Sequence, residues 1–408
     1  MSLSASPCKP VAVTGAGFVS PIGNDFAAFD RALFGGISAV RPHALDLPGF
    51  DLPAVAVASA AFDIGSVTAP SRVPLDRGTA MALAAAADAA QSAGLVAGSY
   101  EPERLGIFWG SGMAGAATFE ATCRTVFAER RRMRPTSVVT TMPNAPVAEL
   151  TLRFGARAAG LTYACACASS AVAIGEAMRA IRAGWVDIAI AGGSESMLTP
   201  GVLASWQAMR VLSASCRPFS ADRDGFALGE AAGALVLESV GHAHRRGAAT
   251  RWQLSGYATN CDGMHITHPD SAGQARAMRA ALADAGLDPG AIGYLNAHGT
   301  ATVAGDTAEA AAVAQVFGAG AVPVSSTKPI HGHLLGAGGA IELLAVLRAL
   351  DAGRLPPTAN TGAPDPAFAI DLVTGDARAL PALRHAMSNS FAFGGTNAVL
   401  VASRADAP

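Results

Sequence analysis

The sequence predicts an α/β fold in which strands are buried between layers of helices. Short apolar runs alternate along the whole chain with alanine-rich segments whose apolar residues recur at helical spacing. Strands that read as continuous apolar runs are typical of sheets covered on both faces. Hydrophobic residues make up 51% of the 408 residues and charged residues only 15%, so the chain has ample apolar area for a deep core.

Six runs are predicted as strands because they are short, apolar and bounded by small or polar residues. In chain order they are 11–14, 105–109, 186–191, 234–237, 294–296 and 322–325. Six longer segments have helical periodicity and are predicted as helices: 26–33, 77–93, 169–183, 274–285, 307–317 and 338–350.

No low-complexity linker divides the chain. We predict a seam near 248–253, which separates an N-terminal half of residues 1–250 from a C-terminal half of residues 251–408. The two halves have comparable strand and helix content. A duplicated architecture is therefore possible, although no repeat in the letters proves it.

Charge and composition exclude several classes of protein. The net charge of −2 argues against bulk attraction to nucleic acid. The N-terminus lacks the basic flank and apolar run of a signal peptide, and the longest charge-free stretch near the middle of the chain, 158–175, is too weakly apolar to span a membrane. The six cysteines form no CxxC pair, and free thiols are typical of the reducing cytoplasm, which we predict as the location. The low charge also predicts a surface covered by a partner subunit.

Three weaker motifs have structural explanations. The run 14–20 resembles the start of a dinucleotide fingerprint, but its third glycine is replaced by Ser20, so we predict a tight strand-to-helix turn. The run 222–225 lacks the later glutamate of a calcium loop and is predicted as a turn. Two histidine pairs, at 265 and 268 and at 331 and 333, lack further ligands at normal spacing, so metal binding is a minor hypothesis.

The rarity of lysine singles out one residue. Of the 29 basic residues 27 are arginine, and only Lys9 and Lys328 are lysine. A lysine that survives in so arginine-rich a chain indicates a position where arginine does not serve. Lys9 lies near the terminus, whereas Lys328 lies between an apolar strand and a helix.

A cysteine-containing turn follows another apolar strand. The run 164–175 contains Cys165 and Cys167 and leads directly into a helix. The N-terminus of a helix lowers the pKa of a thiol and offers free N–H groups that hold an oxyanion. An inert buried thiol is the alternative, and the motif alone leaves both open.

Chemically active residues follow further strands. His298 lies in the run 296–302, Lys328 and His333 lie in 326–336, and a glycine-rich turn lies in 389–397. Catalytic groups gather in loops that follow buried strands. Four strand ends that carry a thiol, two histidines, the rare lysine and a glycine-rich turn together indicate an active site.

These motifs, in this order, resemble the β-ketoacyl-[acyl-carrier-protein] synthases of the thiolase superfamily. The resemblance is to the elongating enzymes of bacterial fatty-acid synthesis and to the related type II polyketide ketosynthases. It extends from Val11 to Val401 and includes the runs 223–230 and 304–309. It implies a thiolase-like fold of two similar α/β halves in five αβαβα layers, and a homodimer.

The resemblance implies a role for each residue of the site. Cys167, rather than Cys165, matches the nucleophile that accepts the acyl chain. His298 and His333 match the pair that faces malonyl-carrier protein during decarboxylation. Lys328 matches the lysine of the site and is expected to pair with Glu309, and Asp306 supports the same region.

Further residues match the substrate-binding parts of the family. The N–H groups of Cys167 and Phe393 match the oxyanion hole, and Phe393 matches an aromatic gate, preceded here by Ala392 where the family usually has glycine. Thr300 and Thr302 match the pantetheine-binding threonines, while Met113 and Trp206 match the acyl pocket. The residues expected to receive the acidic carrier protein are Arg124, Arg130, Arg131, Arg132, Arg134 and Arg210, although a solvated charge run is the usual alternative.

The resemblance implies an acyltransferase that joins an acyl-cysteine intermediate to malonyl-carrier protein by decarboxylative Claisen condensation. No metal or soluble cofactor is expected, because the phosphopantetheine arrives on the carrier protein. One alternative is the catalytic subunit of a type II polyketide or polyene system that needs a chain-length-factor partner. An acyltransferase or hydrolase without decarboxylation and a non-catalytic carrier-binding scaffold are the others. The starter unit, the chain length and the pathway stay open.

Overall fold

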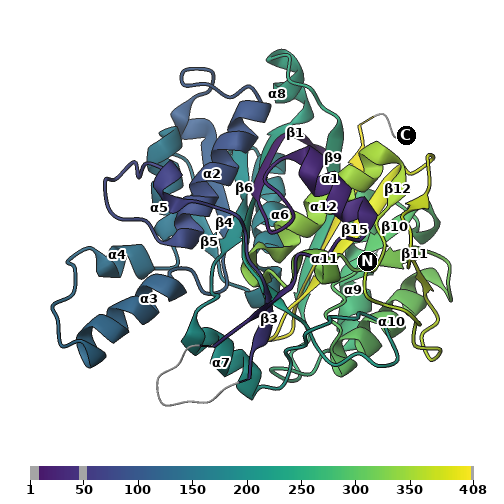
Figure 1. Ribbon diagram of the computed structural model, residues 1–408. Helices are drawn as coiled ribbons and strands as arrows, with labels where there is room; N and C mark the ends of the chain where they lie inside the picture. The colour runs from purple at the N-terminus through teal and green to yellow at the C-terminus, as the bar shows by residue number, and fades with distance from the viewer. Residues whose placement is uncertain (1–8, 46–52, 406–408) are drawn as a thin grey trace.

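Eleven strands form one continuous sheet in the computed structural model, which describes residues 9–45 and 53–405 (Figure 1). In sheet order they are β13 (Asp371–Leu372), β11 (Pro323–Ser325), β10 (Tyr294–Asn296), β15 (His385–Phe391), β16 (Thr396–Arg404), β9 (Trp252–Cys261), β1 (Val11–Val19), β8 (Ala231–Ser239), β6 (Ile188–Glu195), β4 (Leu105–Gly110) and β5 (Gly160–Tyr163).

The sheet contains one topology twice, and the two copies are joined where β1 pairs with β9. Numbered in chain order within each half, the strands β1, β4, β5, β6 and β8 are arranged 1-5-4-2-3, and so are β9, β10, β11, β15 and β16. In both halves the first two pairings are antiparallel and the last two are parallel. The duplicated architecture is thus present in the topology, while the division into two domains at residue 250 stays a prediction.

Helices cover both faces of each half of the sheet, in the expected five layers. The central helices α6 (Ser169–Arg182) and α12 (Gly338–Ala352) pack between the two halves of the sheet. The outer layer over the N-terminal half contains α2 (Arg77–Ser92) and α5 (Ala145–Phe154). The outer layer over the C-terminal half contains α9 (Ser271–Ala285) and α10 (Val303–Phe317). The α/β fold class with αβαβα layers is therefore as predicted.

Shorter elements surround this core. The remaining helices are α1 (Phe26–Gly35), α3 (Ala116–Cys123), α4 (Ser137–Thr141), α7 (Pro200–Ala208), α8 (Val240–Arg245) and α11 (Lys328–His331). The remaining strands are β2 (Arg41–His43), β3 (Val55–Ala58), β7 (Leu228–Gly229), β12 (Arg354–Leu355) and β14 (Arg378–Ala379). In Figure 1 the segment with α3 and α4 extends from the body as an arm. No helix in the described ranges is long and apolar enough to cross a membrane.

The predicted turn at 14–20 is wrong. This run continues β1 as far as Val19, and its glycines serve packing rather than a turn. A Cβ atom on Gly15 would lie 2.2 Å from the carbonyl oxygen of Ala89, and one on Gly17 would lie 2.3 Å from that of Ala85. The two glycines therefore allow α2 to lie directly against the strand.

Candidate active site

Cys167 lies in a single 3₁₀ turn, Ala166–Ala168, between β5 and the start of α6. The turn is held by Ser169, whose Oγ accepts the N–H of Cys165 at 2.9 Å and donates to the carbonyl of Ala166 at 2.7 Å. Ala166 has the positive φ of 47°. The Cys167 side chain is buried and lines a cavity, whereas Cys165 packs against the core between the two halves of the sheet.

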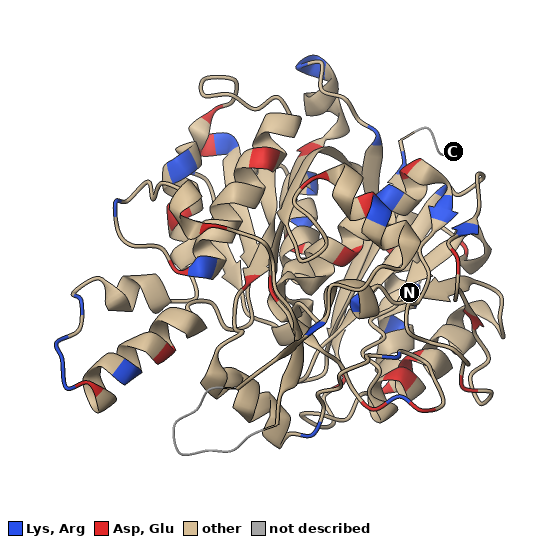
Figure 2. Cartoon of the chain, viewed as in Figure 1, with Lys and Arg blue, Asp and Glu red and all other residues tan. Residues whose placement is uncertain are grey.

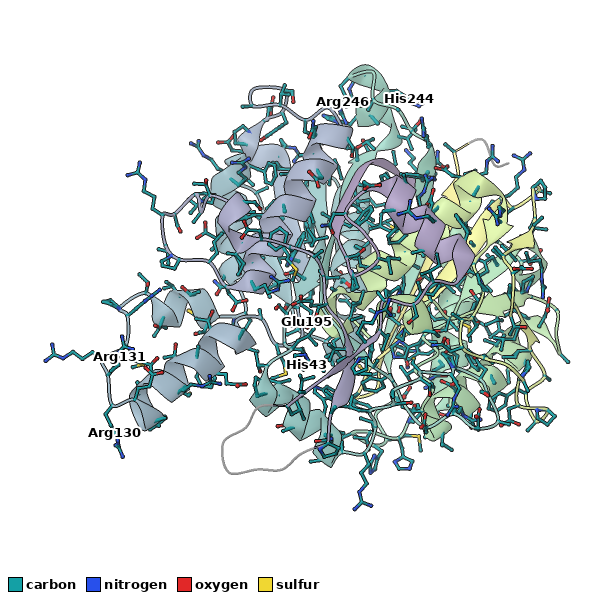
Figure 3. The ribbon with its side chains drawn as sticks, in the orientation of Figure 1. His43, Arg130, Arg131, Glu195, His244 and Arg246 are labelled. Atoms are coloured by element: carbon teal, nitrogen blue, oxygen red, sulfur yellow. The ribbon has the colours of Figure 1, made fainter. Side chains whose placement is uncertain are left out.

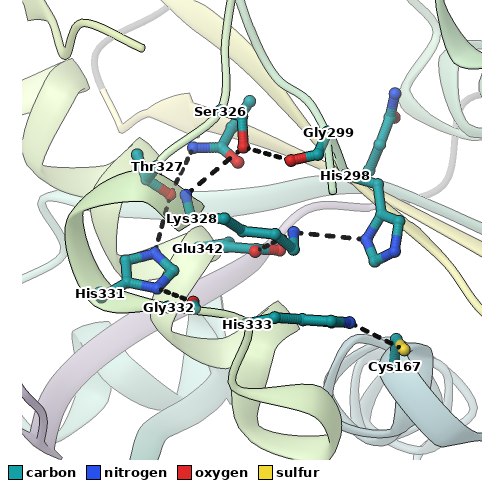
Figure 4. A network of polar contacts seen from close by, with 12 residues as sticks. Cys167, His298, Gly299, Ser326, Thr327, Lys328, His331, Gly332, His333 and Glu342 are labelled. Atoms are coloured by element: carbon teal, nitrogen blue, oxygen red, sulfur yellow. Dashed lines mark hydrogen bonds and ion pairs between the residues drawn. The ribbon is translucent and has the colours of Figure 1, made fainter. Parts of the chain in front are cut away.

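Two histidines meet at the cysteine. His333 Nε2 lies 3.1 Å from Cys167 Sγ, and the His298 and His333 rings lie 5.5 Å apart at an angle of 79° (Figure 4). His298 comes from the loop after β10, and His333 follows α11. The structure thus brings together three residues that the sequence distributes over more than 160 positions.

Lys328 is fully buried and forms an ion pair with Glu342 of α12, at 2.5 Å between Nζ and Oε1. The expected pairing with Glu309 is wrong. Glu309 instead accepts the backbone N–H groups of His298 at 2.9 Å and of Gly299 at 2.7 Å. Both carboxylate oxygens of Glu309 thus accept backbone donors, so the role of Glu309 is to shape the turn that carries His298.

Glu342 is the site residue that the sequence analysis missed. It lies in an otherwise apolar segment of α12 that is buried between the two halves of the sheet. A carboxylate buried in so apolar a segment needs a cationic partner. That requirement, together with the rare lysine nearby, was the available signal.

The surroundings of each ring indicate which nitrogen of His298 and of His333 carries the proton. Lys328 Nζ lies 3.4 Å from His298 Nδ1. An ammonium group can only donate, so His298 carries its own proton on Nε2. In His333 the Nδ1 atom has no hydrogen-bond partner in the described chain. An unpaired buried acceptor costs less than an unpaired N–H, so its proton also belongs on Nε2, next to the sulfur.

Burial keeps both imidazoles neutral. Desolvation, and then the charge of Lys328, hold the pKa of His298 and of His333 well below the usual value. At neutral pH the site therefore contains the ion pair of Lys328 and Glu342 and two neutral N–H donors.

The expectation of a lowered thiol pKa is wrong. Burial raises the pKa of the Cys167 thiol to about 12, although the charge of Lys328 and the N–H of Phe393 act in the opposite direction. The resting nucleophile is therefore a thiol beside a neutral imidazole. The tertiary environment, which removes water from the sulfur, outweighs the helix terminus.

The remaining loop residues form the mouth of the cavity. Thr300 Oγ1 and Thr302 Oγ1 lie 3.0 Å apart, and both threonines line it. Asp306 is buried beneath them and accepts the N–H of Ala301, and burial raises its pKa to about 7. The backbone N–H of Phe393 acts to lower the pKa of the Cys167 thiol, and both residues line the cavity.

The cavity above Cys167 has a volume of about 270 Å³ and a mainly apolar lining. Trp206 lies in its wall, with its ring 6.2 Å from that of Phe393 and nearly parallel to it. A second apolar cavity of about 460 Å³ adjoins it under α3 and α7. Trp206 and Met209 line both cavities, whereas Met113 lines only the second.

The predicted arginine patch falls into two parts. Arg210 lies between Met209 and Val211, which both line the first cavity. Arg124 extends α3 and approaches Glu120 at 3.7 Å. The other four lie between α3 and α4, and Figure 3 shows Arg130 and Arg131 directed into solvent on the arm. The charge is therefore spread along the arm, as Figure 2 also shows.

The donor atoms of Cys167, His298 and His333 lie within 4.8 Å of one another, close enough to hold a metal ion. Lys328 lies directly against this group, and its positive charge opposes a cation there. The residues present therefore suit a developing negative charge better than a metal. The absence of a cofactor stays a prediction.

The chain belongs to the beta-ketoacyl synthase family. The family's N-terminal domain matches residues 8–243 and its C-terminal domain matches residues 252–362. The protein is thus an acyltransferase that condenses acyl chains and lengthens them by two carbons.

Particular relatives cover almost the whole chain. Nodulation protein E of Rhizobium leguminosarum bv. trifolii is 40% identical, over 96% of this chain and 98% of its own length. The 3-oxoacyl-[acyl-carrier-protein] synthase 2 of Staphylococcus aureus (strain COL) is 37% identical, over 98% and 99%.

Solved structures share the fold. The ishigamide ketosynthase/chain length factor matches with a TM-score of 0.90 and 31% identity, over 97% of this chain and 99% of that chain. A type II polyketide ketosynthase in complex with its acyl-carrier protein matches with a TM-score of 0.89 and 29% identity, over 98% and 100%. The thiolase-like fold class is thereby confirmed.

Replacing Lys328 by arginine tests the buried ion pair. We expect Lys328→Arg to lower condensation turnover roughly 100-fold, because the planar guanidinium does not fit between Glu342 and His298 and displaces the histidine. Turnover is measured with purified carrier-bound substrates, and Lys9→Arg, the same change at the exposed lysine, is the control. Near wild-type turnover of Lys328→Arg would contradict this account.

Proposed function

We propose that this beta-ketoacyl synthase uses Cys167 as its nucleophile and His298 and His333 as the donors that drive decarboxylation of malonyl-carrier protein. The observation that carries the proposal is the contact of 3.1 Å between His333 Nε2 and Cys167 Sγ beneath an apolar cavity. The second donor, His298, lies beside the first and is held by Lys328.

In the first half-reaction the sulfur of Cys167 attacks the thioester carbon of an acyl-carrier protein. The C–S bond to the pantetheine breaks, and the thiol proton ends on the departing pantetheine sulfur. The N–H groups of Cys167 and Phe393 hold the oxyanion that forms in between. The apolar cavity takes the acyl chain, and Thr300 and Thr302 bind the pantetheine arm at its mouth.

In the second half-reaction malonyl-carrier protein replaces the discharged carrier. Both Nε2–H groups donate to the thioester oxygen while the C–C bond to the carboxylate breaks and carbon dioxide leaves. The enolate carbon then attacks the acyl-Cys167 thioester, and the sulfur leaves as a thiolate that takes up a proton. Two neutral N–H donors suit this step, because negative charge grows on the oxygen they face, and Lys328 holds His298, one of the two.

No metal or soluble cofactor enters this scheme, because the carrier protein brings the phosphopantetheine. We propose that the protein is located in the cytoplasm and forms a homodimer. The homodimer is supported by the apolar surface of the arm, where Phe119, Phe127 and Val138 are each more than 60% exposed.

A heterodimer with a chain-length factor is the second candidate for assembly. The solved ishigamide complex of ketosynthase and chain length factor favours it. The native mass of the chain expressed alone distinguishes the two, because a dimer mass supports the homodimer and a monomer without condensation activity supports the heterodimer. A scaffold without catalysis, or an acyltransferase or hydrolase that only loads Cys167, requires the two histidine donors to be idle.

Mass spectrometry of the pure chain tests the proposed function. We expect acyl-carrier proteins to leave an acyl adduct on the Cys167 peptide, and malonyl-carrier protein to convert it to a β-ketoacyl-carrier product. The Cys167→Ser variant is the control for the site of the adduct. No adduct with any acyl chain would contradict the proposal, and an adduct without condensation would favour the heterodimer or the simple transferase.

The position of Trp206 predicts an effect on chain length. Trp206 lines both cavities, so we expect that removal of its ring opens one into the other. Trp206→Ala should then raise kcat/KM for long relative to short acyl chains by about tenfold, while Trp206→Phe changes the ratio less. Competition between carriers of different chain length gives the ratio. Trp185→Ala, which removes a tryptophan that is 73% exposed, is the control. An unchanged ratio in Trp206→Ala would exclude Trp206 as a barrier.

Charge reversal tests the proposed carrier-binding residues. We expect Arg210→Glu, and Arg130→Glu with Arg131→Glu, to raise the KM for carrier-bound substrates about tenfold at low salt with little change in kcat, because rim charges act mainly on association. Arg245→Glu, on α8 at the opposite end of the molecule, is the control (Figure 1). Unchanged KM at low salt would remove these arginines from the docking surface.

A further inference from the structure

A third buried histidine, His331, lies in α11 between Lys328 and His333 and lines neither cavity. Its ring forms two hydrogen bonds (Figure 4). Nδ1 lies 2.7 Å from the carbonyl oxygen of Gly332, and Nε2 lies 2.9 Å from Thr327 Oγ1. The pairing of His331 and His333 as metal ligands is therefore not available, since both nitrogens of His331 are already used.

The two contacts define the state of the ring. A carbonyl oxygen only accepts, so Nδ1 carries the proton and donates to Gly332. Burial, and then the charge of Lys328, lower the pKa of His331 to about 3, so the ring is neutral. Nε2 is then an acceptor for the hydroxyl of Thr327. That hydroxyl oxygen also lies 3.4 Å from Asn296 Nδ2, which donates to it.

The partners of His331 directly precede two residues of the active site. Thr327 precedes Lys328, and Gly332 precedes His333. Gly332 has a φ of 77°, and a Cβ atom there would lie 3.0 Å from that of Ala58, so the chain bends sharply in a crowded place. The orientation of the peptide group between Gly332 and His333 sets the direction in which the His333 side chain leaves the backbone.

We propose that His331 is a positioning residue that holds the side chain of Thr327, directly before Lys328, and the peptide group before His333, and so aims the His333 donor at the reacting thioester. The inference rests on the proposed function of His333. The N–H of the same peptide group donates to the carbonyl oxygen of Ala227 at 2.7 Å, and the His333 carbonyl accepts the N–H of Gly229 at 2.9 Å. The planar peptide group before His333 is thus held at its N–H by Ala227 and at its carbonyl oxygen by the His331 ring.

Three variants separate the two hydrogen bonds of His331. Asparagine places an amide N–H near the position of Nδ1 and keeps the bond to Gly332, whereas glutamine reaches the position of Nε2 and keeps the bond to Thr327. Leucine removes both. His385→Leu is the matched control, because His385 is also buried and bonds a serine hydroxyl, Ser403 Oγ at 2.7 Å, but lies at the start of β15.

The two half-reactions are measured separately, with the melting temperature of every variant. We expect His331→Leu to lower decarboxylation of malonyl-carrier protein about 30-fold and acyl transfer to Cys167 less than about threefold, because the oxyanion N–H groups do not depend on His331. His331→Asn should recover most of the decarboxylation rate, and His331→Gln less. His385→Leu should lower the melting temperature without separating the two rates.

Equal loss of both half-reactions in His331→Leu, or no recovery in His331→Asn, would overturn the positioning role. So would an unchanged decarboxylation rate in a folded His331→Leu. Failure of the proposed function itself has a different result, since the wild-type chain would then not decarboxylate malonyl-carrier protein. If His331→Leu does not fold, the comparison of His331→Asn with His331→Gln decides, and equal rates in these two would refute the inference.

Discussion

The ion pair between Lys328 and Glu342 is the interaction on which the active site depends. Both groups lie in the central layer with no access to water. Such a pair is costly to bury and strongly destabilising to break, so it fixes its surroundings rather than adding net stability. Its ammonium group sets the proton of His298 on Nε2, and its charge adds to the effect of burial, which keeps both histidines neutral. The protonation of the donors thus depends first on burial and then on this one charge.

The same burial explains the state of the nucleophile. Cys167 stands at the start of a helix, which favours a thiolate, but it is enclosed by apolar side chains, which oppose one. The effect of burial on the thiol pKa is the larger of the two. Little of the cysteine is therefore thiolate at rest, and the site depends on N–H donors placed where negative charge develops during the reaction. The nearby carboxylates Glu309 and Asp306 accept hydrogen bonds from backbone N–H groups of the loop that carries His298.

The sequence predicted those features that local patterns determine. Cys167, His298 and His333 were recognisable because each follows an apolar strand, and Lys328 because lysine is so rare. Features set by packing were not predictable in this way. The partner of Lys328 comes from another helix, and the pKa of Cys167 depends on groups distant in sequence. The glycines of β1 were misread as a turn because only the neighbouring helix reveals why they are small. Of the eleven-stranded sheet, β9, β13 and β16 were not predicted as strands, since short or mixed polar-apolar patterns carry a weaker signal.

The duplicated topology places one turn twice. Before α6 the chain turns at Ala166 with φ 47°, and before α12 it turns at Leu335 with φ 45°. Each turn is closed by the same hydrogen bond, from Ala168 to Cys165 and from Ala337 to Leu334, and the two turns pack against each other. One copy carries the thiol, and the other follows the histidine that faces it. The thiol and the histidine that faces it thus come from different halves of the chain, and the site is assembled only where the two copies of the turn meet.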